Sequence, residues 1–432
     1  MKNSLHSEIF WLTCPSIVSN ITVPLLSMVD TTIVGHMGSP SYIGAIAIGS
    51  TLFNMVYWIF GFLRMGTTGL VSQAHGAENL PLKLLVLRKS LLYGCCISAI
   101  LLLLQIPFLR WAFLLMKPEA TIASYASQYF HVCIWGAPAM LSQYCLTGWM
   151  IGVQDTRSPM WIAISQNLIN IVASLFFVFY CRLRIEGVAL GTVVAQWSGC
   201  LMALMVLLKK YRVSIKDLTT IPTSIALPHR QFFSVNGNLF LRTLCMVAVT
   251  LYFTSAGSQM GNEILSANSL IMQFFILYSY FVDGLANAAE ALSGRYVGAE
   301  DWRMLRHTVS ALFSWGLAIS VAFSLLYAVS GDLMLRLFTD QESIILTARS
   351  YLPWAYAIPL VALMAMVWDG IFIGTTQTRG MLVATAIAML VFFAVWFLLK
   401  HSLLNHALWL AFVCYLLTRG IVQTIVFNHY KQ

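Results

Sequence analysis

Twelve apolar stretches recur along this chain of 432 residues, each long enough to cross a lipid bilayer as a helix. A spanning helix needs about 20 consecutive apolar residues. Charged residues make up 9% of the chain, far below the roughly 25% of soluble domains. We therefore predict an all-α polytopic membrane protein with twelve transmembrane helices. The expected spans are residues 9–35, 43–72, 88–112, 121–152, 158–181, 186–209, 232–258, 264–294, 305–328, 343–375, 380–400 and 404–428.

The net charge of +9 arises from basic residues spread over the short loops between the spans. Membrane proteins concentrate Lys and Arg in their cytoplasmic loops. A cytoplasmic N-terminus gives the inner loops most of these residues, although Arg182 and Arg184 then lie outside. We therefore expect both termini in the cytoplasm and no nucleic-acid partner. No signal-peptide pattern opens the chain, so the first stretch should remain as a span.

The nine cysteines and nine histidines indicate neither a disulfide framework nor a metal centre. All the cysteines lie inside or at the edge of apolar stretches, where a thiol behaves as a small apolar group. The histidines are scattered without metal-ligand spacing. We expect no metal, no cofactor and no catalytic residue, and we do not expect an enzyme.

The second half of the chain repeats patterns of the first half at a nearly constant offset. Residues 148–157 and 370–379 share their glycines and a final Thr-Arg, and Gly76-Ala77-Glu78 recurs as Gly298-Ala299-Glu300. Six spans per half give both halves the same orientation, so they should form parallel repeats with a cavity between them. We predict an N-terminal six-helix lobe at residues 1–210 and a pseudo-symmetric C-terminal six-helix lobe at 232–432. A cytoplasmic linker at 211–231, with Pro222 and Pro228, should join them.

One acid, Asp30, lies within the first apolar stretch. A carboxylate in a spanning helix costs about 2.5–3.5 kcal/mol, so it normally faces a polar cavity or a partner. Pro15 and Pro24 precede it, and each removes a backbone hydrogen bond, which allows the helix to bend. Asp30 could serve in transport, or it could simply bind a neighbouring helix.

A second charged group is expected in the C-terminal lobe, where Arg242, Asp283, Glu290 and Asp369 lie inside predicted spans. Asp283 and Glu290 are two helical turns apart and share one helix face. The rise of a helix, about 1.5 Å for each residue, places all four in the cytoplasmic half of the bilayer. Arg242 could neutralise one of the acids. A structural ion network and a role in transport both remain open.

Several of these patterns resemble the multidrug and toxic compound extrusion (MATE) transporters and, within them, the branch typified by DNA-damage-inducible protein F. They are the first-stretch prolines with Val29-Asp30-Thr31, Gly76-Ala77-Glu78, Gly148-Trp149-Met150-Ile151-Gly152, Leu241-Arg242-Thr243-Leu244 and residues 282–291. The resemblance covers essentially the whole chain. It implies a secondary antiporter that exports cationic or amphipathic organic compounds in exchange for protons or sodium ions.

The resemblance also implies roles for single residues. Asp30 would be the essential acid, Asn170 would lie near it, and Pro15 would be the bending proline. Ser174 stands where many relatives carry a second acid, which weakens the case for sodium and favours protons. The implied setting is a bacterial inner membrane, with small organic substrates and membrane lipids as partners, and we expect a monomer.

Three other functions would leave different patterns in the sequence. A lipid-linked glycan flippase of related fold should line its cavity with several cations, whereas Arg64, Arg242 and Arg349 are the arginines assigned to spans. A membrane enzyme should show a paired-acid metal motif, a histidine cluster or a nucleophile with its base. A channel should show a filter loop or a symmetric pore ring.

Overall fold

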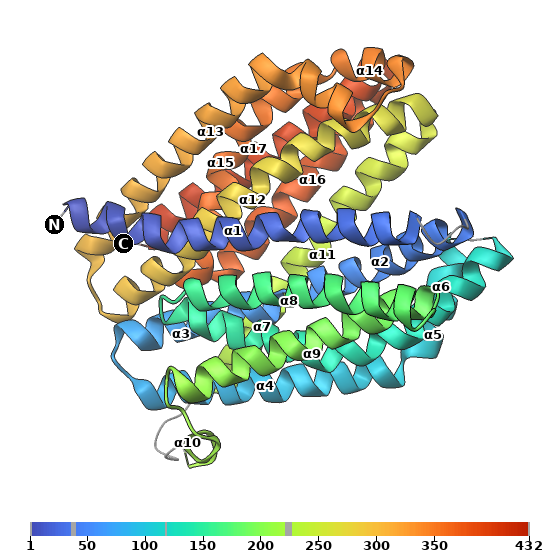
Figure 1. Cartoon of the computed structure of the whole chain (residues 1–432). Helices are drawn as coiled ribbons and strands as arrows, with labels where there is room; N and C mark the ends of the chain where they lie inside the picture. The colour runs from blue at the N-terminus through green and yellow to red at the C-terminus, as the bar shows by residue number, and fades with distance from the viewer. Residues whose placement is uncertain (1, 36–39, 117–118, 221–226, 431–432) are drawn as a thin grey trace. The chain divides into compact units, whose positions relative to one another are not determined.

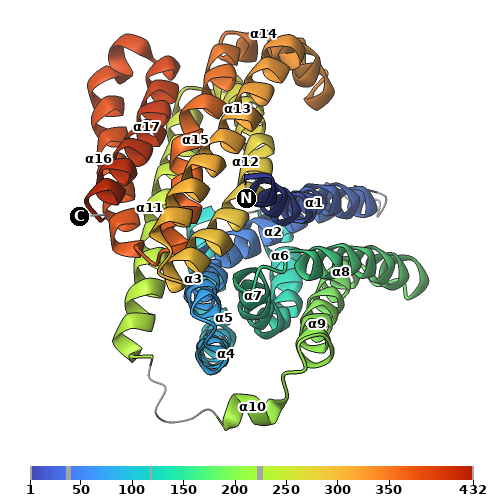
Figure 2. The same cartoon turned by 90° about the vertical axis from the view of Figure 1, so that its left-hand side faces the viewer.

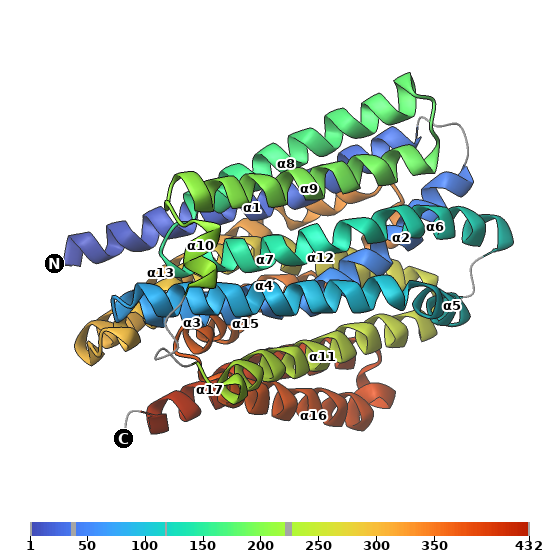
Figure 3. The same ribbon diagram turned by 90° about the horizontal axis from the view of Figure 1, so that it is seen from below.

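The computed structural model describes residues 2–35, 40–116, 119–220 and 227–430, which form helices and connecting turns without a strand. Figures 1, 2 and 3 show the helices from three directions. The α-helices are α1 Lys2–Gly35, α2 Pro40–Phe60, α3 Phe62–Gly76, α4 Leu80–Leu103, α5 Gln105–Met116, α6 Ala120–Cys133, α7 Ala137–Gly152, α8 Arg157–Leu175, α9 Ile185–Lys209, α10 Ile215–Thr219, α11 His229–Gln259, α12 Asn262–Gly298, α13 Trp302–Phe338, α14 Glu342–Arg349, α15 Leu352–Gly374, α16 Thr378–Leu403 and α17 Asn405–Tyr430. A 3-10 turn, η1 Ile134–Gly136, and a π-helical turn, η2 Phe176–Tyr180, complete the set.

Eleven helical segments of the described residues are long and apolar enough to span a membrane. The predicted span at 121–152 is divided into α6 and α7 by η1. Two features explain the break. Pro138 has no N–H to continue the helical ladder, and a Cβ atom at Gly136 would lie 1.6 Å from Oε1 of Gln196.

The chain divides into two compact units, Val18–Pro228 and Met1–Ile17 with His229–Gln432. The predicted lobes differ from these units at the start of the chain, because α1 contributes residues up to Ile17 to the unit formed by the C-terminal half. The packing explains this assignment: a Cβ atom at Gly284 of α12 would lie 2.5 Å from the Ile17 side chain. Pro222 of the predicted linker lies outside the described residues.

Each unit has its own apolar core. In the unit Val18–Pro228, α8 runs along α9 and α4 along α7 (Figures 1 and 3), and buried aromatic residues such as Phe53 and Phe130 pack in its interior. In the other unit, α16 runs along α17 and α12 along α15 (Figures 1 and 2). Phe274, Tyr327 and Trp409 are fully buried there.

The internal repeat is visible as repeated helix contacts. A Cβ atom at Gly148 of α7 would lie 2.5 Å from the Arg64 carbonyl oxygen of α3. A Cβ atom at Gly370 of α15 would lie 2.5 Å from the Ala286 carbonyl oxygen of α12. Both members of the second pair follow those of the first by the same offset in the sequence. The repeated glycines therefore mark equivalent close backbone approaches in the two units.

The Gly-Ala-Glu repeats mark a shared turn geometry. Glu78 and Glu300 both adopt positive φ angles, 53° and 56°. The next residues, Asn79 and Asp301, cap the following helices by accepting hydrogen bonds from backbone N–H groups three residues later. Side-chain oxygens at this position satisfy otherwise unpaired N–H groups of the first turn. The motif therefore has a structural role in both halves.

Candidate functional site: a buried acid in one unit and an ion network in the other

Asp30 lies near the end of α1, in the unit Val18–Pro228. The helix is continuous through Pro15 and Pro24. The Asp30 side chain is half-buried, and among the described residues no group donates a hydrogen bond to its buried Oδ1 atom. A buried polar atom that lacks a partner costs about 1–3 kcal/mol. Asp30 is therefore held in an energetically costly environment within its own unit.

Helix α6 faces this acid. Tyr129 and Cys133 are buried and lie within electrostatic range of Asp30. Tyr129 packs so closely on α2 that a Cβ atom at Gly49 would lie 2.4 Å from its ring, and it lies near Thr192 of α9. Neither Cys133 nor Thr192 was singled out from the sequence. The four-residue spacing of Tyr129 and Cys133 was the one sequence pattern that could have placed both on the same face of α6.

Asn170 and Ser174 are buried on one face of α8 and bind each other and α9. Ser174 Oγ donates to Asn170 Oδ1 at 3.4 Å, and Asn170 Nδ2 donates to Thr192 Oγ1 at 3.4 Å. A Cβ atom at Gly191 would lie 2.3 Å from Ser174 Oγ. Helix α9 approaches so closely at Gly191 that only a small side chain fits at position 174. Thr192, which accepts the hydrogen bond from Asn170, also lies near Tyr129.

Glutamines extend the polar face of α8 and α9. Gln143 Nε2 donates to Gln166 Oε1 at 2.6 Å, and Gln196 Nε2 donates to the Tyr57 hydroxyl at 3.4 Å. Gln166 precedes Asn170 by four residues and Gln196 follows Thr192 by four, so each pair shares a helix face. A period of four among polar residues in apolar helices could have identified this stripe from the sequence.

In the other unit, Asp369 of α15 is the centre of a buried ion network. Arg242 of α11 and Arg419 of α17 both donate to its Oδ2 atom. Gln423 donates to Oδ1 at 2.7 Å, and the Arg419 guanidinium lies 5.5 Å from the Tyr415 ring centroid. Three helices are therefore joined through one carboxylate.

The sequence-based set overlaps only partly with this network. Arg242 and Asp369 are joined directly, whereas Asp283 of α12 is exposed, and Glu290 is buried where α12 packs on Gly374. The assignment of Arg64, Arg242 and Arg349 as the arginines within spans was wrong, because Arg419 lies inside α17. A single guanidinium barely changes the mean hydropathy of a span, and long basic side chains are often assumed to snorkel.

Asp155 forms a third charged group, in the turn between α7 and α8. It accepts hydrogen bonds from Lys210 and Tyr211, each at 2.6 Å, and from the Ser158 backbone N–H at 3.1 Å. Burial alone would raise the pKa of Asp155, but these donors outweigh burial and lower the pKa. Burial, together with the bond to Asp155, raises the pKa of Tyr211. These hydrogen bonds hold Lys210 and Tyr211, at the start of the segment after α9, against the turn between α7 and α8.

Among the described residues, no three His, Cys, Asp or Glu side chains form a cluster that could bind a metal ion. The chemistry available at Asp30 is that of a single carboxylate among neutral polar groups. Such a group can bind a proton or attract a cation.

Comparisons with known proteins agree with this architecture. The MatE family model matches residues 15–176 and 239–398. DNA damage-inducible protein F of Escherichia coli is 32% identical over 418 residues, which cover 97% of this chain and 91% of that protein.

Solved structures of membrane transporters share the fold, and two of them illustrate the similarity. One, an outward-facing multidrug resistance MATE family transporter of the MOP superfamily, superposes with a TM-score of 0.89 at 17% identity, covering 99% of this chain and 96% of that chain. A MOP superfamily transporter from Pyrococcus furiosus gives 0.88 at 16% identity, with the same coverage. These similarities confirm the predicted all-α polytopic membrane fold.

Proposed function

The chain belongs to the MatE family of membrane transporters, and we propose that it exports cationic or amphipathic organic compounds in exchange for protons. It is a multi-pass membrane protein and a transporter rather than an enzyme. The proposal further places it in a bacterial inner membrane as a monomer, with both termini in the cytoplasm.

The buried Oδ1 atom of Asp30, to which no group in the described part of the chain donates a hydrogen bond, carries the proposal. A protein that tolerates this cost in a spanning helix gains a group whose charge can be switched by one proton. Sodium, as a hard cation, would favour several oxygen ligands. Ser174 supplies a neutral hydroxyl where a second acid would strengthen such a site. Protons are therefore the proposed coupling ion, with sodium as the alternative to be tested.

The exchange cycle follows from the charge of Asp30. Ionised Asp30 attracts a cationic substrate, and protonation removes this attraction and releases the substrate. Proton and substrate therefore compete for one site, which supplies the differential affinity that coupled exchange requires. Asn170, Ser174 and Thr192 would adjust the polarity around the acid through their shared hydrogen bonds.

Helix α1 is the element proposed to transmit this change. It passes from one unit to the other between Ile17 and Val18, shortly after Pro15. Proline lacks the N–H that would otherwise tie this turn together, so bending there is inexpensive. We assign Pro15 and Pro24 this bending role, in an alternating-access cycle in which the two units move as bodies.

The ion network around Asp369 would keep one of these bodies rigid. Its three hydrogen-bonded helices, α11, α15 and α17, could not separate without stranding a buried charge. We therefore assign Arg242, Asp369 and Arg419 a structural role. Asp283 and Glu290 remain candidates for a part in transport.

Everted vesicles carrying wild type, Asp30→Asn or Asp30→Glu test the proposal. Accumulation of a fluorescent lipophilic cation is driven in turn by a proton gradient and by a sodium gradient. We expect accumulation with the proton gradient in wild type, its loss in Asp30→Asn, and partial retention in Asp30→Glu, which keeps a titratable group.

Other outcomes would redirect the assignment. Accumulation driven by the sodium gradient alone would show that sodium, and not the proton, is the coupling ion. If properly folded wild-type protein transported under neither gradient, the substrate class would be wrong, and the lipid-linked glycan flippase would be the next candidate to test. Undiminished transport by Asp30→Asn would contradict the role of this acid.

A further inference from the structure

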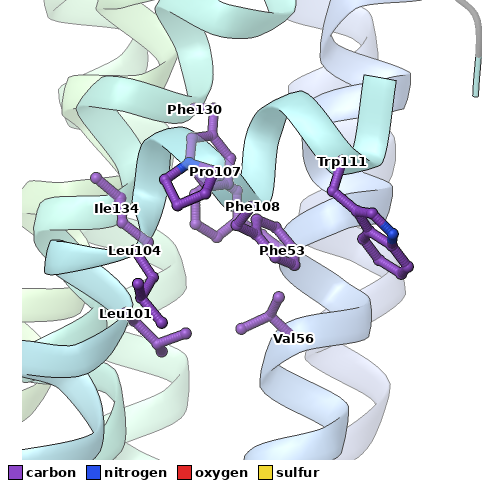
Figure 4. A pocket seen from close by; sticks show the side chains of 9 residues that line it. All are labelled: Phe53, Val56, Leu101, Leu104, Pro107, Phe108, Trp111, Phe130 and Ile134. Carbon is purple, nitrogen blue, oxygen red and sulfur yellow. The ribbon is translucent and has the colours of Figure 1, made fainter. Parts of the chain in front are cut away.

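A cavity of about 310 Å³ opens in the unit Val18–Pro228, and none of the glutamines of the polar stripe on α8 and α9 lines it. It lies between α2, the α4–α5 junction, α6 and η1. Figure 4 shows Leu101 and Leu104 on one side of it and Val56 on the other. Its lining residues are Phe53, Val56, Leu101, Leu104, Pro107, Phe108, Trp111, Phe130 and Ile134.

The break between α4 and α5 lies at the edge of this cavity. Helix α4 ends at Leu103 and α5 begins at Gln105. Pro107, in the first turn of α5, has no N–H with which to extend the α4 ladder. Leu101, Leu104 and Pro107, which lie on either side of the break, all line the cavity.

One wall of the cavity is preformed by aromatic stacking. The Phe53 and Phe130 rings are stacked at 4.9 Å, and the Phe108 and Phe130 rings at 5.8 Å. Stacked rings from α2, α5 and α6 restrict one another, so this wall is held in place without a ligand.

The chemistry of the lining selects its ligand. The nine side chains carry no charge, and the indole N–H of Trp111 is the one polar side-chain group among them. Water needs two to four polar partners to occupy a buried site, and a cationic substrate needs an acceptor or a counter-charge. An aliphatic chain needs neither, and it gains free energy from each methylene that it buries.

The position of the cavity indicates which molecule would supply the aliphatic chain. Leu104 and Trp111 line the cavity and are also largely exposed, so the cavity opens on an apolar outer surface of the kind that lipid covers in a membrane protein. At its other end α4 contacts the segment after α9, through Arg88 and the Leu218 carbonyl. If that segment is cytoplasmic, the cavity faces the outer leaflet.

We propose that this cavity is a binding site for one acyl chain of an outer-leaflet phospholipid. Trp111 and the exposed Arg110 lie together on α5. Trp is enriched at the membrane interface, and the long Arg side chain can reach the headgroups. The lipid chain would lie against Phe130, the residue after Tyr129. The proposal does not depend on the coupling ion or on the exported compound.

Photolabelling of the full-length protein in nanodiscs tests the site. The probe is a phospholipid with a diazirine near the end of one acyl chain, and labelled positions are mapped by mass spectrometry. We expect label to concentrate on the lining residues of α2, α4 and α5. Leu101→Trp should lower that label severalfold by filling the cavity. Leu92→Trp is the matched control, because Leu92 lies on α4, is exposed and does not line the cavity.

Two results would overturn the proposal. The first is label that follows surface exposure alone and is unchanged by Leu101→Trp. The second is complete displacement of the label by dodecyltrimethylammonium, which would assign the cavity to the alkyl tail of an amphipathic cation. Val56→Phe, a smaller filling substitution, replaces Leu101→Trp if that variant does not elute as a single folded species.

Discussion

Asp30 and Asp369 are both aspartates within spanning helices, but their surroundings are opposite. Two arginines and Gln423 donate to Asp369, whereas Oδ1 of Asp30 receives no hydrogen bond from the described residues. A carboxylate that binds several partners contributes to folding. One that lacks them is retained at a cost that function must explain.

This contrast predicts different effects on stability. Asp369→Asn should lower the free energy of unfolding by about 3–5 kcal/mol, because it leaves two buried arginines without their counter-charge. Asp30→Asn should leave stability near wild type. Thermal unfolding of the purified proteins in one detergent compares them. Equal melting temperatures for the two variants would contradict the structural role of Asp369.

Asp155 makes a pH-dependent contribution to stability. Its pKa in the folded protein is lowered, so the stabilisation is complete above the unfolded pKa of about 3.9 and is lost as pH falls through the folded pKa. Asp155→Asn should lower the free energy of unfolding at pH 7 by only about 1 kcal/mol, because solvent screens the partly exposed Lys210. The difference in melting temperature between wild type and Asp155→Asn should shrink as pH falls below about 3.9 and should close below the lowered folded pKa.

The exposed Asp340 supplies the control for this prediction. Asp340→Asn should leave the melting temperature unchanged across the same pH range. A constant difference between wild type and Asp155→Asn down to pH 3 would show that the Lys210 and Tyr211 bonds do not depend on the charge of Asp155.

At the scale of the element, the repeated glycines set how closely helices approach. Gly370→Ala should destabilise by about 1–3 kcal/mol, because its Cβ atom would lie 2.5 Å from the Ala286 carbonyl oxygen. Gly237→Ala on α11 meets nothing within 4 Å, and it should stabilise by about 0.5–1 kcal/mol through helix propensity. Denaturation of both variants gives the comparison. Equal effects would mean that the α12–α15 contact is looser than described.

Apolar length and internal repetition were sufficient to predict the helices and their duplication. Interruptions within spans were harder to predict. The break at η1 combines Pro138, which is visible in the sequence, with a contact between Gly136 and Gln196, which lie far apart in the sequence. Arg419 of α17 likewise pairs with an acid of the separate helix α15. Local sequence patterns carry no information about such pairings. Asp30 was recognisable because an acid inside an apolar stretch is costly wherever the chain places it.

At the scale of the whole molecule, α1 links the acid to the division into units. It supplies residues to both units, and its passage between them lies next to Pro15. The proposed coupling acid, Asp30, and the proposed bending prolines therefore lie on one continuous helix, which contributes residues to both units. The sequence predicted two lobes, but it could not assign the start of α1, up to Ile17, to the second of them, because that assignment depends on packing against Gly284.

The most direct test of the central claim is proton release when substrate binds. Purified wild-type and Asp30→Asn proteins in weakly buffered detergent solution are mixed with a lipophilic cation, and the pH change and the bound cation are measured together. Wild type should release protons in proportion to the cation bound, and Asp30→Asn should release none. Equal release by both proteins, or cation binding to wild type without release, would contradict the exchange of a proton for substrate at Asp30.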